Sequence, residues 1–96
     1  MAQGVAKPTT IKAAQLMAVL KAQNYRCAYS GRELTPETAS VDHKLPVSRG
    51  GTNDLDNLAI VHVDVNTAKA AMTLDEYLQV CRDVVRHFEQ RQSVAG

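Results

Sequence analysis

The sequence lacks, or has little of, three features that would each indicate a particular class of protein. No apolar run approaches the roughly 20 residues that a membrane-spanning helix needs, and the first residues hold no apolar stretch long enough for a signal peptide. Cys27 and Cys81, the only two cysteines, lie far apart in the chain. We therefore expect no membrane association, a cytoplasmic location, and two free thiols rather than one long-range disulfide.

Net charge is also almost absent, at +1, but it is unevenly distributed. Residues 1–32 contain five basic residues and no acidic ones, whereas residues 33–96 contain six basic and ten acidic residues. Such asymmetry indicates one face for an anionic partner and another that holds a cation or faces water. A solvated basic helix explains the same charges equally well, so charge alone does not decide between them.

Internal repeats and low-complexity segments are absent as well. With 45% hydrophobic and 22% charged residues, the composition is that of a globular domain and is too apolar for a disordered chain. A chain of 96 residues can bury one modest core. We expect a single domain over residues 9–92, with flexible tails at residues 1–8 and 93–96.

In the first part of this domain, the sequence predicts a helix followed by the two strands of a hairpin. Thr9 or Thr10 can cap an alanine-rich helix that reaches about Gln23. A short extended stretch is expected within residues 39–47. Residues 58–61, a compact apolar and β-prone run, predict the second strand.

The second part predicts two helices. Asp64 can cap a short helix that reaches Ala71. Thr73 and Glu76 have the spacing of a capping box, which starts a longer helix expected to end near Arg91. Apolar residues at steps of three and four give this helix one continuous face: Leu74, Tyr77, Leu78, Cys81, Val84, Val85 and Phe88. The elements together predict an α+β fold.

A few polar residues around the predicted hairpin are suited to acid–base and metal chemistry. Asp42 and His43 end the first strand; histidine is the side chain best matched to proton abstraction near neutral pH. Asp42 is a hard oxygen ligand suited to Mg²⁺, and Asn66 on the short helix offers a second, neutral oxygen. Asn57 alone would be a turn residue. Each residue is a weak signal by itself, and their order and spacing carry the prediction.

Five short motifs give the chain a resemblance to a known family. They are Val-Asp-His-Lys-Leu-Pro at 41–46, Ser-Arg-Gly-Gly at 48–51, Asp-Asn-Leu at 56–58, Asn-Thr-Ala-Lys at 66–69 and Met-Thr-Leu-Asp-Glu-Tyr at 72–77. In this order, over a core of about residues 25–77, they resemble the HNH endonuclease family in the compact form common in phages and bacteria. The resemblance implies a bacterial or phage-infected cell as the setting of the cytoplasmic protein.

The resemblance also implies a fold, a reaction and a set of roles. The fold is the ββα-metal hairpin and helix, here flanked by an N-terminal and a C-terminal helix. The reaction is the hydrolysis of DNA phosphodiester bonds, by nicking or double-strand cleavage of duplex DNA, and it uses one divalent cation. His43 becomes the general base, Asp42 and Asn66 become metal ligands, and Asn57 becomes an orienting residue that holds the loop and the His43 backbone.

The chain departs from the family pattern in two respects. The third signature position is Asn66 rather than histidine, and an oxygen ligand there favours Mg²⁺ or Mn²⁺ over Zn²⁺. Many relatives also carry a structural zinc knuckle of four cysteines, and the corresponding positions here are Cys27, Ser30, His62 and Val65. Only two of these can bind zinc, so no structural zinc is expected. Packing of the two flanking helices would then have to supply the stability.

Some further residues have more than one interpretation. His62 and Asp64 are auxiliary metal-ligand candidates, but a local hydrogen bond for His62 and a helix cap for Asp64 are open alternatives. Tyr25 and Tyr29 are predicted to be core residues. The predicted phosphate contacts are Arg49, Lys69 and Lys44 near the loop and Lys12, Lys21 and Arg26 in the basic N-terminal third.

Two other functions remain open on the sequence alone. One is a non-catalytic DNA-binding module that keeps the hairpin, although such a module has no chemical reason to retain all four signature residues. The other is an accessory subunit of a larger nuclease or packaging complex, which the low net charge favours because nonspecific DNA affinity comes mainly from phosphate neutralisation. A protein partner or a homodimer is compatible with each of these functions.

Overall fold

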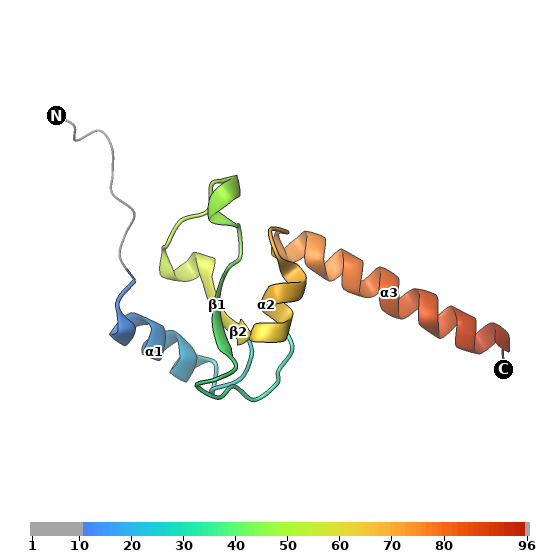
Figure 1. The fold of residues 1–96 in the computed structure, drawn as a ribbon, viewed down its shortest axis with the longest axis horizontal. Coiled ribbons are helices and arrows are strands. Elements are labelled where there is room, and N and C mark those ends of the chain that lie inside the picture. Colours follow the sequence, from blue (N-terminus) through green and yellow to red (C-terminus); the bar gives the residue numbers. More distant parts are fainter. Residues whose placement is uncertain (1–10, 96) are drawn as a thin grey trace.

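The computed structural model describes residues 11–95 of the chain, and within them an antiparallel hairpin lies between helices (Figure 1). The elements in chain order are α1 (Ala13–Ala22), β1 (Ala39–His43), β2 (Leu58–His62), α2 (Val63–Lys69) and α3 (Leu74–Ala95). Two short 3₁₀ turns, Val47–Arg49 and Leu55–Asn57, lie in the loop that joins the strands. The predicted α+β class, with a strand–strand–helix centre and a helix on either side, is confirmed.

The hairpin pairs β1 with β2 in a register that runs from Ala39 opposite His62 to His43 opposite Leu58. Residues 58–61 of β2 are all buried, as an uninterrupted apolar run requires. Helix α2 begins directly after His62, so no linker separates it from the strand, and it packs against both strands. This arrangement returns α2 along the hairpin and carries its residues back toward the end of β1.

The core of the domain is small. Its buried centre consists of Cys27, Ala59, Val61 and Val65, and three partly buried side chains pack against it: Tyr29, Leu34 and Tyr77. Cys27 lies in a tight turn closed by a bridge between residues 26 and 33. Cys27 and Cys81 are both free thiols, as predicted. Tyr25, predicted to be a core residue, is instead 49% exposed.

Helix α1 is attached to the hairpin by Gln23, the residue that follows it. The Gln23 side chain donates from Nε2 to the Ile60 carbonyl oxygen (2.7 Å) and accepts at Oε1 from the Ile60 backbone N–H (3.0 Å). The amide thus satisfies both backbone groups of one residue on the open edge of β2. The predicted caps Thr9 and Thr10 lie outside the described residues.

The cap of α2 differs from the prediction. His62, not Asp64, is the N-cap, because its Nδ1 accepts the Asp64 backbone N–H at 3.1 Å. Asp64 is instead in the first turn of the helix. The helix ends at Lys69, two residues before the predicted Ala71, because Ala70 takes a φ of +49° that no helical residue adopts.

Helix α3 begins with the predicted capping box. The Thr73 backbone N–H donates to Glu76 Oε1 (2.9 Å), and the Glu76 N–H donates to Thr73 Oγ1 (3.2 Å). The helix then continues to Ala95, beyond the predicted end at Arg91. None of the helices described is both long and apolar enough to cross a membrane.

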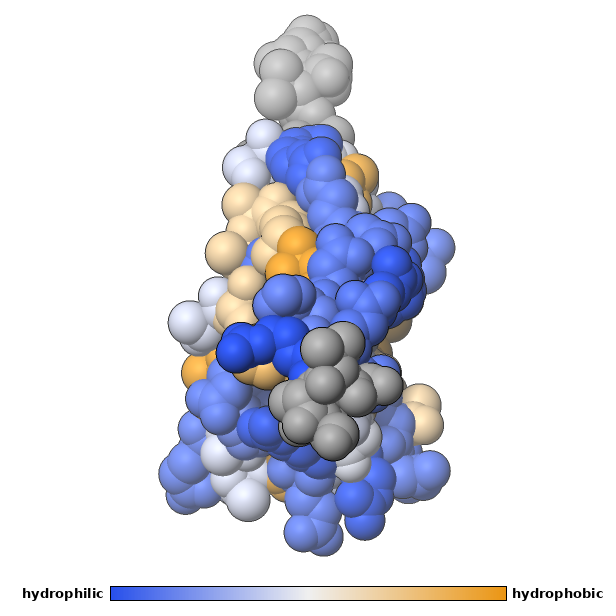
Figure 2. All heavy atoms as spheres, turned by 90° about the vertical axis from the view of Figure 1, so that its right-hand side faces the viewer, coloured by the Kyte–Doolittle hydropathy of each residue, from blue (hydrophilic) through white to orange (hydrophobic). Residues whose placement is uncertain are grey.

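Only the first turns of α3 contact the core, through Tyr77. Beyond these first turns the helix projects away from the hairpin (Figure 1). The longest dimension of the molecule is 66 Å. Val84, Val85 and Phe88 are 51–54% exposed. The expectation that the C-terminal helix packs along the core is therefore wrong for these turns. Figure 2 views the molecule from the side toward which α3 points, where hydrophilic surface predominates and apolar areas are interspersed.

Candidate active site

Asn57 organises the loop between the two strands. Its Oδ1 accepts the Leu45 backbone N–H at 3.0 Å, and its Nδ2 donates to the carbonyl oxygens of Leu45 (3.1 Å) and Thr52 (2.7 Å). Its own backbone carbonyl accepts the N–H of Lys44 at 2.8 Å. Asn57 therefore fixes the chain immediately after His43, by hydrogen bonds that span the loop.

Gly51 is required by the same loop. A Cβ atom at this position would lie 1.7 Å from the Leu45 carbonyl oxygen and 3.0 Å from Asn57 Nδ2. No side chain fits at these distances, so a residue larger than glycine would separate the two halves of the loop. The second glycine of the Ser-Arg-Gly-Gly motif is thus required for a steric reason that the sequence alone did not show.

A pocket of about 190 Å³ lies where the end of β1, the loop and the end of α2 meet. It is lined by Val41, Asp42, His43, Pro46, Val47, Asn66 and Ala70. Three of the four signature residues, Asp42, His43 and Asn66, therefore share one cavity although 24 positions separate the first from the last. Asn57 does not line it and acts on the loop instead.

Asp42 is the buried anion of this site, with 4% of the residue exposed. Its Oδ2 accepts a hydrogen bond from the Tyr29 hydroxyl at 2.6 Å, and its Oδ1 accepts one from Lys69 Nζ at 3.1 Å. A carboxylate this deep requires partners, because burial of an unpaired charge is costly. The two partners do not line the pocket, so they hold the carboxylate from the protein side.

Lys69 is completely buried, and its ammonium also donates to the His43 carbonyl oxygen at 3.0 Å. The prediction that Lys69 contacts a DNA phosphate is therefore wrong, since nothing of the residue reaches the surface. The ammonium instead joins two consecutive residues of β1 from α2. Sequence reasoning missed this role because lysine is ordinarily a surface residue.

Tyr29 packs against the core, as predicted, but its hydroxyl belongs to the site. Burial and then the hydrogen bond to Asp42 raise the pKa of the Tyr29 phenol far above its usual range. The hydroxyl therefore remains protonated and donates to the carboxylate. No pattern in the sequence connected Tyr29 with Asp42, which is 13 positions away.

The imidazole of His43 is held by Asn53, with 2.7 Å between His43 Nε2 and Asn53 Oδ1. An amide oxygen only accepts, so in the neutral ring Nε2 carries the proton and Nδ1 keeps its lone pair. Asn53 is not among the candidate residues that the sequence indicated. Its position in the loop that Asn57 folds back is what brings it to the histidine.

Asn66 is oriented by its amide nitrogen. Nδ2 donates to Ser40 Oγ at 2.6 Å and to the Val41 carbonyl oxygen at 3.3 Å, both on β1. With Nδ2 engaged on the strand, Oδ1 is the amide atom that can bind a ligand in the pocket.

The auxiliary candidates His62 and Asp64 are not brought to this pocket. His62 lies opposite Ala39, at the other end of the hairpin from His43. The Asp64 side chain is 72% exposed and pairs with Arg32 at 3.4 Å. In the described part of the chain, no three His, Cys, Asp or Glu side chains form a group that could hold a metal.

The remaining basic candidates are exposed to different degrees and bound differently. Arg49 makes a bidentate ion pair with Glu76, which connects the loop to α3. It also donates a hydrogen bond to the Ala71 carbonyl oxygen. The hydrogen bond from Arg49, followed by that from Thr73, lowers the pKa of Glu76 to about 2. The other candidates are exposed: Lys44 beside the pocket residue His43, and Lys12, Lys21 and Arg26 on or next to α1.

Comparison with known protein families gives one match. The model of the HNH endonuclease family matches residues 25–71, from the turn that holds Cys27 through the hairpin to two residues beyond α2. The matched stretch thus contains every residue that lines the pocket. Among curated proteins, none is significantly similar to the chain.

Proposed function

Through residues 25–71 the chain belongs to the HNH endonuclease family, and from this we propose that it hydrolyses phosphodiester bonds of duplex DNA with one divalent cation, Mg²⁺ or Mn²⁺. The observation that carries the proposal is the shared pocket of Asp42, His43 and Asn66. The carboxylate and the amide oxygen can bind the cation, and the imidazole can act as the general base of such a hydrolysis.

The residues of the pocket fit a hard cation. Asp42 and Asn66 offer oxygen atoms, which Mg²⁺ and Mn²⁺ prefer, and the described residues that line the cavity include no thiolate and no second imidazole. Tyr29 and Lys69 each donate one hydrogen bond to a different carboxylate oxygen of Asp42, and such an oxygen has lone pairs for more than one partner. When bound, the cation would stabilise the negative charge that develops on the phosphoryl and leaving oxygens.

His43 acts as the general base. Because His43 Nε2–H donates a hydrogen bond to Asn53 Oδ1, Nδ1 is the ring nitrogen that takes the proton from the attacking water. The same hydrogen bond stabilises the imidazolium that this transfer produces. The hydrogen bond to Asn53 thereby fixes both the tautomer and the orientation of the His43 ring.

Asn57, Gly51 and Lys69 position these groups without contacting the substrate. Asn57 and Gly51 set the path of the loop that brings Asn53 to His43. Lys69 bonds both the Asp42 carboxylate and the His43 carbonyl, so one side chain fixes the relative position of the ligand and the base. Loosely held supporting residues would lower the rate even with all pocket residues present.

The duplex is held outside the pocket by the exposed basic residues. Lys44 is exposed and follows His43 directly, so it would neutralise a phosphate next to the scissile one. Arg49 can contribute only by exchanging its ion pair with Glu76 for a phosphate. Lys12, Lys21 and Arg26 on the N-terminal side would hold more distant phosphates, which positions the duplex without reading its sequence.

Supercoiled plasmid incubated with the purified full chain tests the proposal. With Mn²⁺ or Mg²⁺ present, we expect conversion to open-circular or linear DNA, and a chelator should stop it. The two cleavage modes differ in whether linear DNA appears together with the open circle or only after it. DNA that binds the protein but stays intact with either cation would identify a non-catalytic binding module and contradict the proposal.

A further inference from the structure

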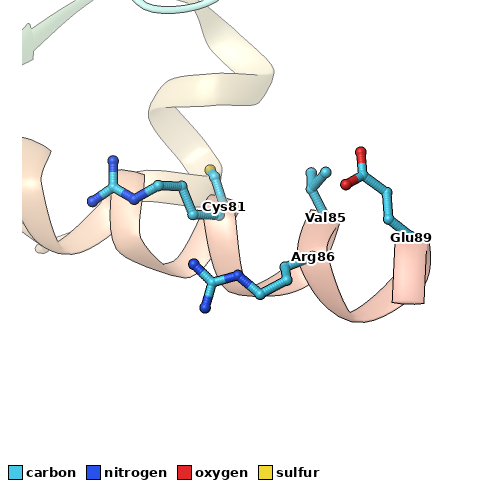
Figure 3. Close-up of a pocket in the computed structure, with 5 residues that line it drawn as sticks. Cys81, Val85, Arg86 and Glu89 are labelled. Atoms are coloured by element: carbon cyan, nitrogen blue, oxygen red, sulfur yellow. The ribbon is translucent and has the colours of Figure 1, made fainter. Parts of the chain in front are cut away.

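The outer turns of α3 carry an apolar face that no other element of the described chain covers. Val80, Val84, Val85 and Phe88 are 46–54% exposed. The last three continue the apolar stripe whose residue Tyr77 contacts the core. A groove of about 400 Å³ accompanies this face, lined by Cys81, Arg82, Val85, Arg86 and Glu89. Figure 3 shows Cys81, Val85 and Glu89 along one side of the helix.

Two residues of opposite charge, Arg82 and Glu89, lie along one edge of this apolar face, here called the charged edge. Arg82 and Glu89 are seven residues apart, which on an α-helix places them about 20° apart around the axis and about 10 Å apart along it. Both line the groove beside Val85. Within the described part of the chain, neither of the two side chains forms an ion pair; Arg82 donates only to the neutral Gln79.

We propose that this face binds the same face of a second copy of the chain, with the two α3 helices antiparallel and a two-fold axis near Val85. The axis keeps the charged edge of one helix beside the charged edge of the other. Arg82 of each copy then lies opposite Glu89 of its partner, so that two ion pairs form by symmetry. Val84, Val85 and Phe88 of the two copies pack between the helices.

The antiparallel direction also follows from the shape of the molecule. The hairpin domain lies at the N-terminal end of α3, and the helix projects from it (Figure 1). Antiparallel helices place the two domains at opposite ends of the pair, whereas parallel helices would bring them side by side. The shared face is about three turns long, which is small for an interface, so the dimer is weak and depends on concentration.

Sedimentation analysis of the full chain over a range of concentrations tests the inference. We expect the mass to rise toward that of a dimer, and Val85→Lys should keep the protein monomeric. The charge change Gln90→Lys, on the opposite face of the helix, is the matched control and should leave the dimer intact. A chain that remains monomeric up to about 1 mM would overturn the proposal and would leave the face to a different partner.

Charge exchange tests the antiparallel register. Arg82→Glu places like charges opposite each other twice, and we expect it to weaken the dimer by about tenfold. Glu89→Arg should do the same, and the double variant should restore the wild-type affinity because it reverses both pairs together. A double variant as weak as either single one would contradict the register. Far-UV circular dichroism confirms that each variant keeps its helix content.

Discussion

The ammonium of Lys69 lies 3.1 Å from Asp42 Oδ1, with the two side chains only 1% and 5% exposed. This pair joins α2 to the end of β1 behind the candidate active site, and the same ammonium bonds the His43 carbonyl. A buried pair of this kind gives little net stability over an apolar pair, but removal of one partner leaves an uncompensated charge.

Lys69→Met should therefore lower the free energy of unfolding by about 3–5 kcal/mol. Lys44→Met, at an exposed position, is the control and should cost less than about 0.5 kcal/mol. Chemical denaturation of the two variants measures both values. Combination with Asp42→Asn should recover part of the loss, because it removes the buried anion as well. Equal stability of the two lysine variants would mean that Lys69 is not buried against Asp42.

Asp42→Asn and Asn66→Ala should each weaken Mn²⁺ binding by at least about tenfold, since even residues that only support a metal ligand have effects of this size. Asparagine at position 42 is preferred to alanine because it keeps the volume and the hydrogen bond from Tyr29. Titration calorimetry measures the affinities. Asp64→Ala is the control, because the Asp64 side chain is 72% exposed and outside the pocket. Wild-type affinity in both pocket variants would assign the cation to other residues.

The Arg49–Glu76 pair gives stability a dependence on acid pH. The pKa of Glu76 is lowered from 4.5 to about 2 by the Arg49 hydrogen bond and then by Thr73. The stabilisation is therefore complete above the ordinary pKa of the carboxyl group and is lost as the pH falls toward 2.

Thermal melts between pH 6 and about pH 2 check this dependence. The wild-type melting temperature should fall more steeply than that of Glu76→Gln, whose side chain does not titrate. Arg49→Gln, which removes the other partner, should flatten the curve in the same direction. Parallel curves for all three proteins would show that the ion pair does not form in solution.

The basic residues of α1 provide a prediction about DNA affinity. Lys12→Gln with Lys21→Gln should weaken binding equally for unrelated duplexes and should flatten the slope of log affinity against log salt by nearly one unit for each lysine that binds a phosphate. Arg86→Gln with Gln90→Glu changes the net charge by the same amount on α3 and serves as the control. If the two pairs change the slope equally, net charge and not contact by α1 sets the affinity. The search for contacts would then turn to Lys44 and Arg49.

Part of this structure could be predicted from the sequence because local rules determine it. The capping box at Thr73 and Glu76 needs only neighbouring residues, and the apolar run of β2 is buried as its composition requires. Asp42, His43 and Asn66 meet in one pocket because a hairpin followed directly by a helix returns to its starting end.

Other features depend on contacts that the sequence does not display. Lys69 is buried only because Asp42 and the His43 carbonyl lie opposite it, and Asn53 reaches His43 only through the fold of the loop. The periodicity of α3 correctly predicted an apolar face. Periodicity does not say what the face packs against, and here the described chain leaves its outer half exposed.

The central claim is that His43 is the base of a hydrolytic site, and cleavage by His43→Ala tests it most directly. His87→Ala is the matched control, since His87 is an exposed histidine on α3. Plasmid cleavage with saturating Mn²⁺ and equal amounts of folded protein compares the variants with the wild type. We predict a rate lower by roughly 10²–10⁴-fold for His43→Ala, the usual contribution of a general base, and an unchanged rate for His87→Ala. A His43→Ala protein that cleaves at the wild-type rate would contradict the account.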